Sequence, residues 1–241
     1  MSHPFDPNKI QFYLTVPAPC PYLPNLMERK VFTQLDPIDG PILNNHFTQL
    51  GFRRSQNVIY RPACENCNSC ESLRIRVNDF ITRKSFRRVN SINADIRVSI
   101  MPSVATYEQF ELLQQYLITR HNGGGMSDMD FSRYQMMVEE CASETDVIEF
   151  RDTDNNLLGV TLIDNLFDGY SMVYSFFDTR LNSRSLGTFM ILNQINRCKN
   201  DGLPYLYLGY WVKGSKKMQY KSRFQPHELL SKNGWHEGGN A

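Results

Sequence analysis

The succession of apolar patterns between residues 106 and 211 constrains the fold more than any other feature of this chain. Segments with the helical spacing of apolar residues come first, and the strand-like runs VIEFRD, LLGVTLIDNL and GYSMVYSFF follow them. The turn signals DNN and FDG separate these runs, so we predict an antiparallel meander. In chain order we predict two helices, three strands, a helix and a strand, over residues 106–120, 131–142, 147–152, 157–166, 169–177, 185–202 and 205–211.

This element order is typical of the acetyltransferase-type α/β (α+β) fold, in which an acyl donor binds where two central strands splay apart. Pro102 and Ser103 mark the expected boundary between that domain, residues 102–241, and a smaller N-terminal domain with a cysteine loop, residues 1–101. Acetyltransferases that use coenzyme A need a small residue at the helix start, where the pyrophosphate approaches the backbone. Phe189 stands at that place, so no coenzyme A is expected.

Three cysteines, Cys64, Cys67 and Cys70, stand three residues apart in the segment YRPACENCNSCES. The strand-like segments 57–61 and 73–77 flank them, so we predict a hairpin that carries the thiols at its tip. The thiols are therefore expected to lie close together.

The metal-binding potential of this loop depends on a fourth ligand. C-x₂-C-x₂-C is the spacing of three ligands on an iron–sulfur cluster or in an incomplete zinc site. Cys20 is the first candidate for the fourth ligand, because it lies in a Pro-rich segment that we expect to be irregular, and His46 is the second. A group of reduced thiols without a metal is the alternative.

Neither a membrane span nor a signal peptide is expected. The sequence has no run of about 18 apolar residues, and its first residues have neither a basic nor an apolar region. The cytoplasm is the expected location, and disulfides are rare there, which favours metal or redox chemistry at the cysteine loop.

Basic residues are clustered although the net charge is only +1, with 26 Lys and Arg against 25 Asp and Glu. A chain-wide affinity for nucleic acid is therefore excluded, and a polyanion would need a local basic surface. A helix predicted from Asp79 to Val89 carries the first cluster, and the second lies towards the C-terminal end. The two clusters are Arg83, Lys84, Arg87 and Arg88, and Lys216, Lys217, Lys221 and Arg223.

Motifs in both halves of the chain resemble one family. YRPACENCNSCESLRIRVNDFITRKSFRR is similar to the N-terminal cysteine loop and basic helix of aminoacyl-tRNA–protein transferases, and SLGT, GLPYLYLGY and KMQYKSRFQPHELL resemble motifs of their C-terminal half. The resemblance extends from about Cys20 to Trp235, and the short bacterial branch looks closest. One departure is HNGGGM at 121–126, where the family has a more acidic HxDGDM-like sequence, so no role is assigned to acidic groups there.

The bacterial branch transfers leucine from leucyl-tRNA to proteins that begin with Asp or Glu, which marks them for degradation. The resemblance implies this reaction here, with leucyl-tRNA and acidic protein N-termini as partners and no cofactor required for transfer. Arginyl transfer, the reaction of the longer eukaryotic branch, is the alternative within the family. A non-catalytic reader of acidic protein N-termini is the alternative from another class.

The implied reaction gives candidate roles to particular residues. An aminoacyl ester is already activated, so the enzyme must position the acceptor amine and ensure that it is deprotonated. Asp178 and His121 are the candidate bases. The acidic side chain of the acceptor needs a cation. Arg184 is the first candidate for that cation, followed by Arg120 and Lys216.

A tRNA donor is a polyanion whose backbone binds Lys and Arg, and its 3′ end can stack on aromatic rings. The candidate stacking residues are Tyr210, Trp211 and Tyr220. The candidate tRNA-binding residues are Arg83, Lys84, Arg87, Arg88, Lys217, Lys221 and Arg223. Met172, Tyr174 and Phe176 alternate on one strand face and are predicted to be core residues.

Overall fold

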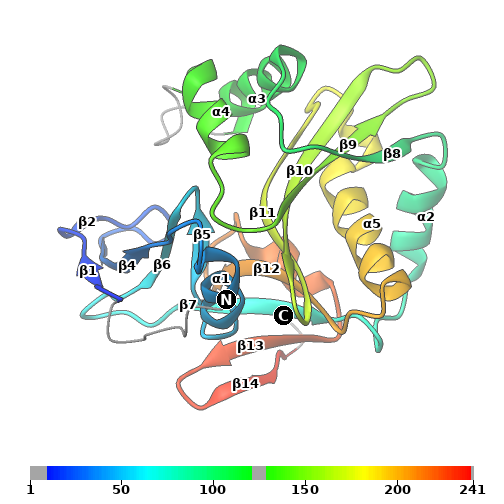
Figure 1. Ribbon diagram of the computed structural model, residues 1–241. Helices are drawn as coiled ribbons and strands as arrows, with labels where there is room; N and C mark the ends of the chain where they lie inside the picture. Colours follow the sequence, from blue (N-terminus) through cyan, green and yellow to red (C-terminus); the bar gives the residue numbers. More distant parts are fainter. Residues whose placement is uncertain (1–9, 121–128, 240–241) are drawn as a thin grey trace.

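The computed structural model describes residues 10–120 and 129–239, and its largest element is a mixed sheet of eight strands. The strand order is β14-β13-β7-β12-β11-β10-β9-β8 (Figure 1). The strands are β7 (Cys70–Arg76), β8 (Arg97–Met101), β9 (Thr145–Arg151), β10 (Leu157–Leu166), β11 (Gly169–Phe177), β12 (Tyr205–Val212), β13 (His227–Ser231) and β14 (Gly234–Glu237).

The predicted element order of the second half is confirmed. Helices α3 (Tyr107–Arg120) and α4 (Phe131–Glu139) precede the antiparallel meander β9-β10-β11, and α5 (Leu186–Asn200) leads from β11 to β12. β11 and β12 run parallel, because the helix between them carries the chain back to the end of the sheet at which β11 began. This is the predicted acetyltransferase-type α/β arrangement.

A smaller sheet forms most of the N-terminal part, at the left of Figure 1. Its order is β1-β4-β6-β5, and α1 (Gly40–Gln49) connects β4 to β5. The expectation that the Pro-rich first 45 or so residues form irregular chain is therefore wrong for β4 and for the start of α1: Pro41 lies in the first turn of α1, where a missing N–H costs nothing. The strands of this part are β1 (Tyr13–Leu14), β2 (Ala18–Pro19), β3 (Met27–Glu28), β4 (Lys30–Gln34), β5 (Arg53–Ser55) and β6 (Val58–Pro62).

The predicted hairpin around the cysteine loop is wrong. β6 pairs with β4 and β5 in the small sheet, whereas β7 pairs with β12 and β13 in the large sheet. The cysteine loop therefore links two sheets. Local strand patterns predicted both strands, but they carry no information about which partner each strand takes.

The expected boundary after residue 101 does not divide the large sheet. β7 and β8 precede that residue, and they lie in the same sheet as β9 to β14. β7 is a central strand between β12 and β13, so the chain on both sides of the boundary shares one hydrogen-bonded sheet and one core.

The basic helix begins later than predicted. α2 (Lys84–Ile92) has Arg83 as its N-cap, and Asp79 does not cap it but pairs with Arg76 (3.3 Å). Phe86 of α2 is buried and stacks on Phe224 at a ring distance of 5.0 Å, which leaves the opposite, basic face exposed.

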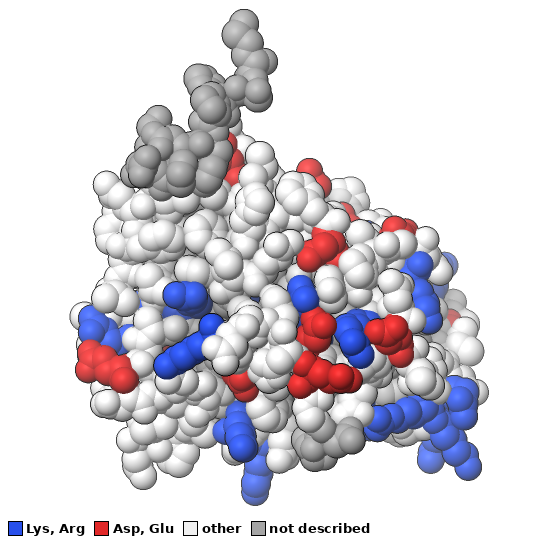
Figure 2. Space-filling model, turned by 90° about the horizontal axis from the view of Figure 1, so that it is seen from below, with Lys and Arg blue, Asp and Glu red and all other residues white. Residues whose placement is uncertain are grey.

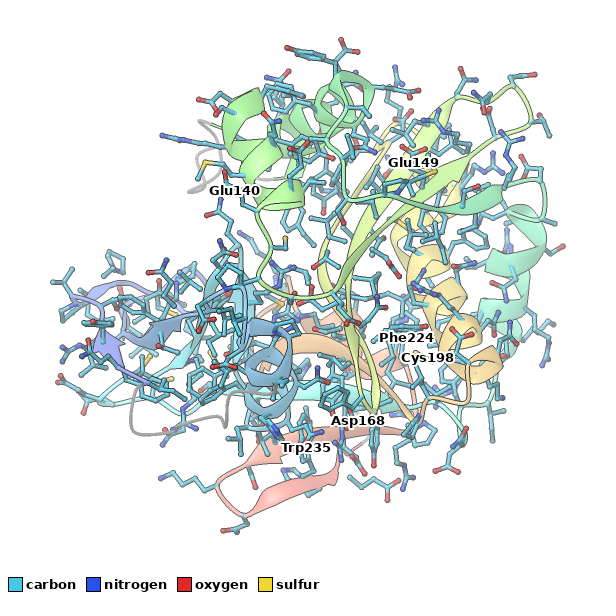
Figure 3. The ribbon with its side chains drawn as sticks, viewed as in Figure 1. Glu140, Glu149, Asp168, Cys198, Phe224 and Trp235 are labelled. Atoms are coloured by element: carbon cyan, nitrogen blue, oxygen red, sulfur yellow. The ribbon has the colours of Figure 1, made fainter. Side chains whose placement is uncertain are left out.

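Two hydrophobic cores lie on opposite faces of the large sheet, because neighbouring strand residues point to opposite sides. On β9, Ile148 packs in the core beneath α5 and α2, whereas Val147 packs in the core beneath α3 and α4. Figure 3 shows Phe224 and Cys198 in the first of these layers, beside α5, where both are buried. In the part of the chain that the structure describes, no helix has the length and apolar character needed to cross a membrane.

Candidate active site

Two parallel strands separate near the middle of the large sheet. β11 and β12 pair only through Gly169–Ser171 and Tyr205–Tyr207. Both strands continue beyond this pairing, to Phe177 and Val212. The backbone groups that face the gap need other hydrogen-bond partners. We call the region between β11 and β12 beyond this pairing the strand opening.

A guanidinium group from the small sheet enters the strand opening. Arg53, the first residue of β5, donates through Nη2 to the carbonyl oxygens of Met172 (3.0 Å) and Val173 (3.1 Å) on β11. Its Nη1 faces Gly209 of β12, where a Cβ atom would lie 2.2 Å from that nitrogen. Gly209 has a φ of +73°, which glycine adopts without strain. The missing side chain at Gly209 therefore lets the guanidinium reach across both strands.

A second cation lies beside Arg53. Lys221, in the short 3₁₀ helix η3 (Gln219–Arg223), is 7% exposed, and its Nζ donates to the carbonyl oxygens of Leu208 (2.8 Å) and Tyr210 (2.6 Å). Burial and the charge of Arg53 lower the pKa of Lys221 to about 7. The expectation that Lys221 contacts tRNA is wrong, because its ammonium group binds the backbone of β12 inside the protein.

The protein does not neutralise these two cations. Within residues 10–120 and 129–239, no carboxylate forms an ion pair with Arg53 or Lys221. Nη1 of Arg53 is buried and has no hydrogen-bond acceptor among the described residues. A buried donor without an acceptor is costly, so the strand opening is suited to receive an oxygen atom from outside the protein.

Tyr174 supplies another unpaired group on β11. It was predicted to be a core residue, and its ring does pack against the core beneath α3, but its hydroxyl is buried without a partner in the described structure. Burial and the neighbouring Tyr116 raise the pKa of Tyr174, so the hydroxyl keeps its proton at neutral pH and can donate it in a hydrogen bond. Met172 and Phe176 are buried as predicted.

Neither predicted base is supported as a proton acceptor by the described residues. Asp178 follows β11, and its carboxylate accepts from the backbone N of Arg180 (2.9 Å) and from Nη2 of Arg180 (2.7 Å). These contacts lower the pKa of Asp178, which makes it a weak base and a well-paired turn residue. His121 lies outside the described residues.

The preferred cation for the acceptor, Arg184, is already occupied. Its Nε donates to Oδ1 of Asn93 (3.0 Å), and its guanidinium pairs with Asp95. These bonds tie η2 (Asn182–Arg184) to the segment that follows α2. The role predicted for Arg184 is therefore contradicted by its structural contacts, which hold the start of α5 against α2.

The other predicted substrate-binding residues differ in exposure. Arg120, Lys216 and Tyr220 are exposed. Tyr210 is buried and its hydroxyl lies 2.8 Å and 3.0 Å from the carbonyl oxygens of Gly51 and Tyr60, to which it can donate its one proton, so the prediction that it stacks on the tRNA 3′ end is wrong. Trp211 is half-buried and packs against the main core.

The basic helix and the end of η3 form one surface. Arg223 is exposed, and its guanidinium lies 6.0 Å from the ring centre of Phe86 on α2. Figure 2 shows Lys and Arg side chains gathered at the lower right, on the side where Figure 1 places α2. Lys217, also a predicted tRNA contact, is exposed. The exposed residues that we call the α2 surface are Arg83, Lys84, Arg87, Arg88 and Arg223.

The cysteine loop lines a cavity of about 660 Å³. The cavity lies between the small sheet and the part of the large sheet formed by β7 and β13. Cys20 lies in the same lining as Cys64, Cys67 and Cys70, whereas His46 is exposed on α1. Burial and the three neighbouring thiols raise the pKa of Cys70 to about 12. The chain therefore brings Cys20 to the loop, as the sequence suggested.

The arrangement of these thiols does not fit a metal ion. Across residues 10–120 and 129–239, no group of three or more Cys, His, Asp or Glu side chains is placed to hold one. No step of a reaction is therefore derived through a metal or cluster here.

Arg53 is the functional candidate that sequence reasoning missed. It stands in GFRRSQNVIY, where neither spacing nor charge clustering distinguishes it. Its contacts are made with Met172, 119 residues further along the chain, so only the folded protein reveals them.

Both halves of the chain match models of known protein families. Residues 18–88 match the family model described as "Arginine-tRNA-protein transferase, N terminus", and residues 108–231 match "Arginine-tRNA-protein transferase, C terminus". Among solved structures, "The structure of L-PGS from Bacillus licheniformis" covers 70% of this chain and 58% of that chain, at 8% identity and a TM-score of 0.49.

Two relatives named "Aspartate/glutamate leucyltransferase" align over almost the whole length. The one from Maricaulis maris is 49% identical, with 98% of this chain and 92% of the relative covered. The one from Sinorhizobium medicae is 53% identical, with 93% of this chain and 91% of the relative covered. This chain therefore belongs to the arginine-tRNA–protein transferase family.

Proposed function

We propose that the protein transfers leucine from leucyl-tRNA to the N-terminal Asp or Glu of acceptor proteins, which marks them for degradation. The observation that carries this proposal is the identity of 49% and 53%, over nearly the whole chain, to two enzymes named aspartate/glutamate leucyltransferase. The cytoplasm is the proposed location, because the reaction needs a charged tRNA.

The proposed reaction joins a free amine to an activated ester. The α-amino nitrogen of the acceptor attacks the leucyl carbonyl, the C–N bond forms, and the C–O bond to the terminal ribose breaks. The nitrogen loses one proton and the ribose oxygen gains one, so no nucleotide or redox cofactor is consumed. The protein must align the two substrates and stabilise the negative charge that develops on the carbonyl oxygen.

The strand opening supports this chemistry. Among the described residues, Nη1 of Arg53 in the strand opening has no acceptor, nor has the buried hydroxyl of Tyr174, a β11 residue whose ring packs in the core beneath α3. Donors that are already in place stabilise anionic oxygen without the cost of reorganising water. Both substrates supply suitable oxygen atoms, the donor in its ester carbonyl and the acceptor in its side-chain carboxylate.

The α2 surface supports binding of the tRNA. Its arginines and lysine are exposed on one side of the molecule, and Lys216 and Lys217 are exposed as well. Contacts of this kind displace counterions from phosphates, so the affinity should fall steeply as the salt concentration rises. The near-neutral charge of the whole chain would not produce such a dependence without a concentrated basic surface.

A transfer assay with leucyl-tRNA as the donor tests the proposal. The protein is incubated with radiolabelled leucyl-tRNA and peptides that differ only in their first residue, Asp, Glu or Ala. We expect label on the Asp and Glu peptides and none on the Ala peptide. Absence of label on all three peptides would refute leucyl transfer.

Arginyl transfer is the second candidate, because both matching family models are described by that activity. Arginyl-tRNA in a parallel reaction distinguishes the two donors. A non-catalytic reader would bind the Asp peptide without labelling it and would show no salt-dependent affinity for tRNA.

Coenzyme A is not proposed as a donor. Phe189 at the start of α5 is buried and packs on Phe150, with ring centres 6.0 Å apart. Acetyltransferases that use coenzyme A need a small residue at this position, so a phenylalanine there argues against that donor. Acetyl-CoA should therefore leave the melting temperature unchanged, since a ligand that binds the native state raises it.

A further inference from the structure

Arg53 and Arg54 are neighbours in β5, but among the described residues only Arg54 has a carboxylate counter-ion. Arg54 forms a two-point ion pair with Asp164 of β10, at 2.7 Å (Nε to Oδ2) and 2.6 Å (Nη2 to Oδ1). Its remaining nitrogen, Nη1, donates to the carbonyl oxygen of Gln56 (2.9 Å). All three nitrogens of Arg54 thus have acceptors, whereas Arg53 has two carbonyls at Nη2 and an unpaired Nη1.

Arg53 is partly buried, but its Nη1 is fully buried, and a charged donor held there without an acceptor is unfavourable unless a ligand supplies one. Lys221 adds a second cationic group next to Arg53, and the carbonyls that it binds flank Gly209. Neutral donors could have satisfied the same carbonyl oxygens. The concentration of basic groups at the strand opening therefore points to an anionic ligand.

Two anions take part in the proposed reaction: the acidic side chain of the acceptor and the phosphates of the tRNA. Phosphates lie on the outside of a wide polyanion, which suits exposed basic residues such as those of the α2 surface. Nη1 of Arg53 is buried and faces β12 at Gly209, so only a small group could reach it. A carboxylate is small and planar, and it matches the planar donors of a guanidinium.

We infer that Arg53 recognises the acidic side chain of the acceptor, with Nη1 donating to its carboxylate. This inference rests on the proposed function, because it assigns the acceptor specificity of that reaction. Gly209 and Lys221 are positioning residues: Gly209 leaves space for the guanidinium, and Lys221 holds the carbonyls on either side of Gly209. A cation favours carboxylates over amides of the same shape, so transfer to Asp and Glu should be faster than transfer to Asn and Gln.

The test measures initial rates of leucyl transfer to four peptides that begin with Asp, Glu, Asn or Gln. It compares the unmodified protein with Arg53→Met and Arg53→Lys. In Arg53→Met we expect KM for the Asp peptide to rise about 10- to 100-fold, the range for losing a hydrogen bond between charged groups. The rate with the Asn peptide and KM for leucyl-tRNA should stay within about twofold, because a neutral amide and the tRNA do not depend on this cation. Arg53→Lys should recover part of the loss, since it keeps the charge without the planar fork.

Two control variants separate specificity from stability. Arg97→Met removes an exposed arginine from β8, the edge strand at the far end of the sheet, and should change nothing. Arg54→Met breaks a buried ion pair next to Arg53 and should lower stability without altering the ratio of Asp to Asn transfer. Both peptides are measured on the same protein sample, so partial unfolding lowers both rates and leaves the ratio unchanged.

Each other outcome has a definite meaning. Equal losses for the Asp and Asn peptides in Arg53→Met would make Arg53 a structural residue and overturn the inference. A higher KM for leucyl-tRNA with an unchanged peptide KM would assign the anion to a phosphate and overturn it as well. If the unmodified protein transfers no leucine, the proposed function fails. Fluorescence anisotropy with a labelled Asp peptide then still tests Arg53, because Arg53→Met should weaken binding without any tRNA present.

Discussion

Gly209→Ala tests whether the strand opening depends on contact between β12 and the guanidinium of Arg53. An added Cβ would lie 2.2 Å from Nη1, 2.3 Å from Cζ and 2.6 Å from Nε of Arg53, so the guanidinium must move. That movement breaks the bonds to the carbonyl oxygens of Met172 and Val173, each worth about 1.5–3 kcal/mol because the donor is charged. The φ of +73° adds about 1–2 kcal/mol of strain for a residue with a Cβ.

The expected decrease in the free energy of unfolding is therefore at least about 4 kcal/mol, a large part of the stability of a typical domain. Gly202→Ala is the matched control: its φ is +69°, but nothing lies within 4 Å of the added Cβ. That variant should lose only about 1–2 kcal/mol, from backbone strain alone. Urea unfolding followed by circular dichroism measures both differences.

A double-mutant cycle isolates the contact. In an Arg53→Ala background no guanidinium opposes the new methyl group, so Gly209→Ala should cost only the strain of about 1–2 kcal/mol. The same cost of Gly209→Ala with and without Arg53 would refute the reasoning. It would show that β12 accepts the methyl group by a shift of its own backbone.

Three further predictions concern other parts of the molecule. Arg54→Met should lower the free energy of unfolding by about 3–5 kcal/mol, because it leaves Asp164 buried without its counter-ion; urea unfolding measures the loss, and a change below about 1 kcal/mol would contradict it. For Lys221 the folded pKa of about 7 lies below the ordinary value of 10.5, so the unfolded state holds more protons between these pH values. The cost of burying charged Lys221 should therefore decrease from pH 7 to pH 10, so that stability rises by up to about 1.4 kcal/mol per pH unit, and equal pH slopes in Lys221→Met and the unmodified protein would argue against it. Arg87→Gln on the α2 surface should weaken leucyl-tRNA binding and reduce the slope of log affinity against log salt by about one, measured by filter binding with Arg97→Gln as the control. An unchanged slope would place the tRNA on another surface.

The second half of the fold could be predicted from local patterns. The meander and the helices on either side of it follow from apolar spacing and turn residues within about 20 residues of each other. The element order of the acetyltransferase-type fold was therefore correct in its sequence and its approximate limits. The N-terminal part was less predictable, because its prolines obscured β4 and α1 and because no local pattern specifies that β7 pairs with β12 and β13.

The candidate site, too, could be predicted only in part from the sequence. The strand β11 and the helix α5 were predicted, and the resemblance of the motifs to the family was correct. The roles of single residues were not. Lys221 and Arg223 are two residues apart and look alike in the sequence, yet one is buried beneath β12 and the other is exposed beside α2.

The amino-acid sequence by itself determined the family, the order of the helices and strands in the second half, and the presence of a basic helix. Each of these depends on residues close together in the chain. Only the tertiary structure decided which charged groups remain unpaired. Arg184 pairs with Asp95, and Arg54 pairs with Asp164. Arg53 enters the strand opening, where its Nη1 has no acceptor among the described residues. The availability of a charge for a substrate depends on which distant segments the fold brings beside it, and a local pattern does not contain that information.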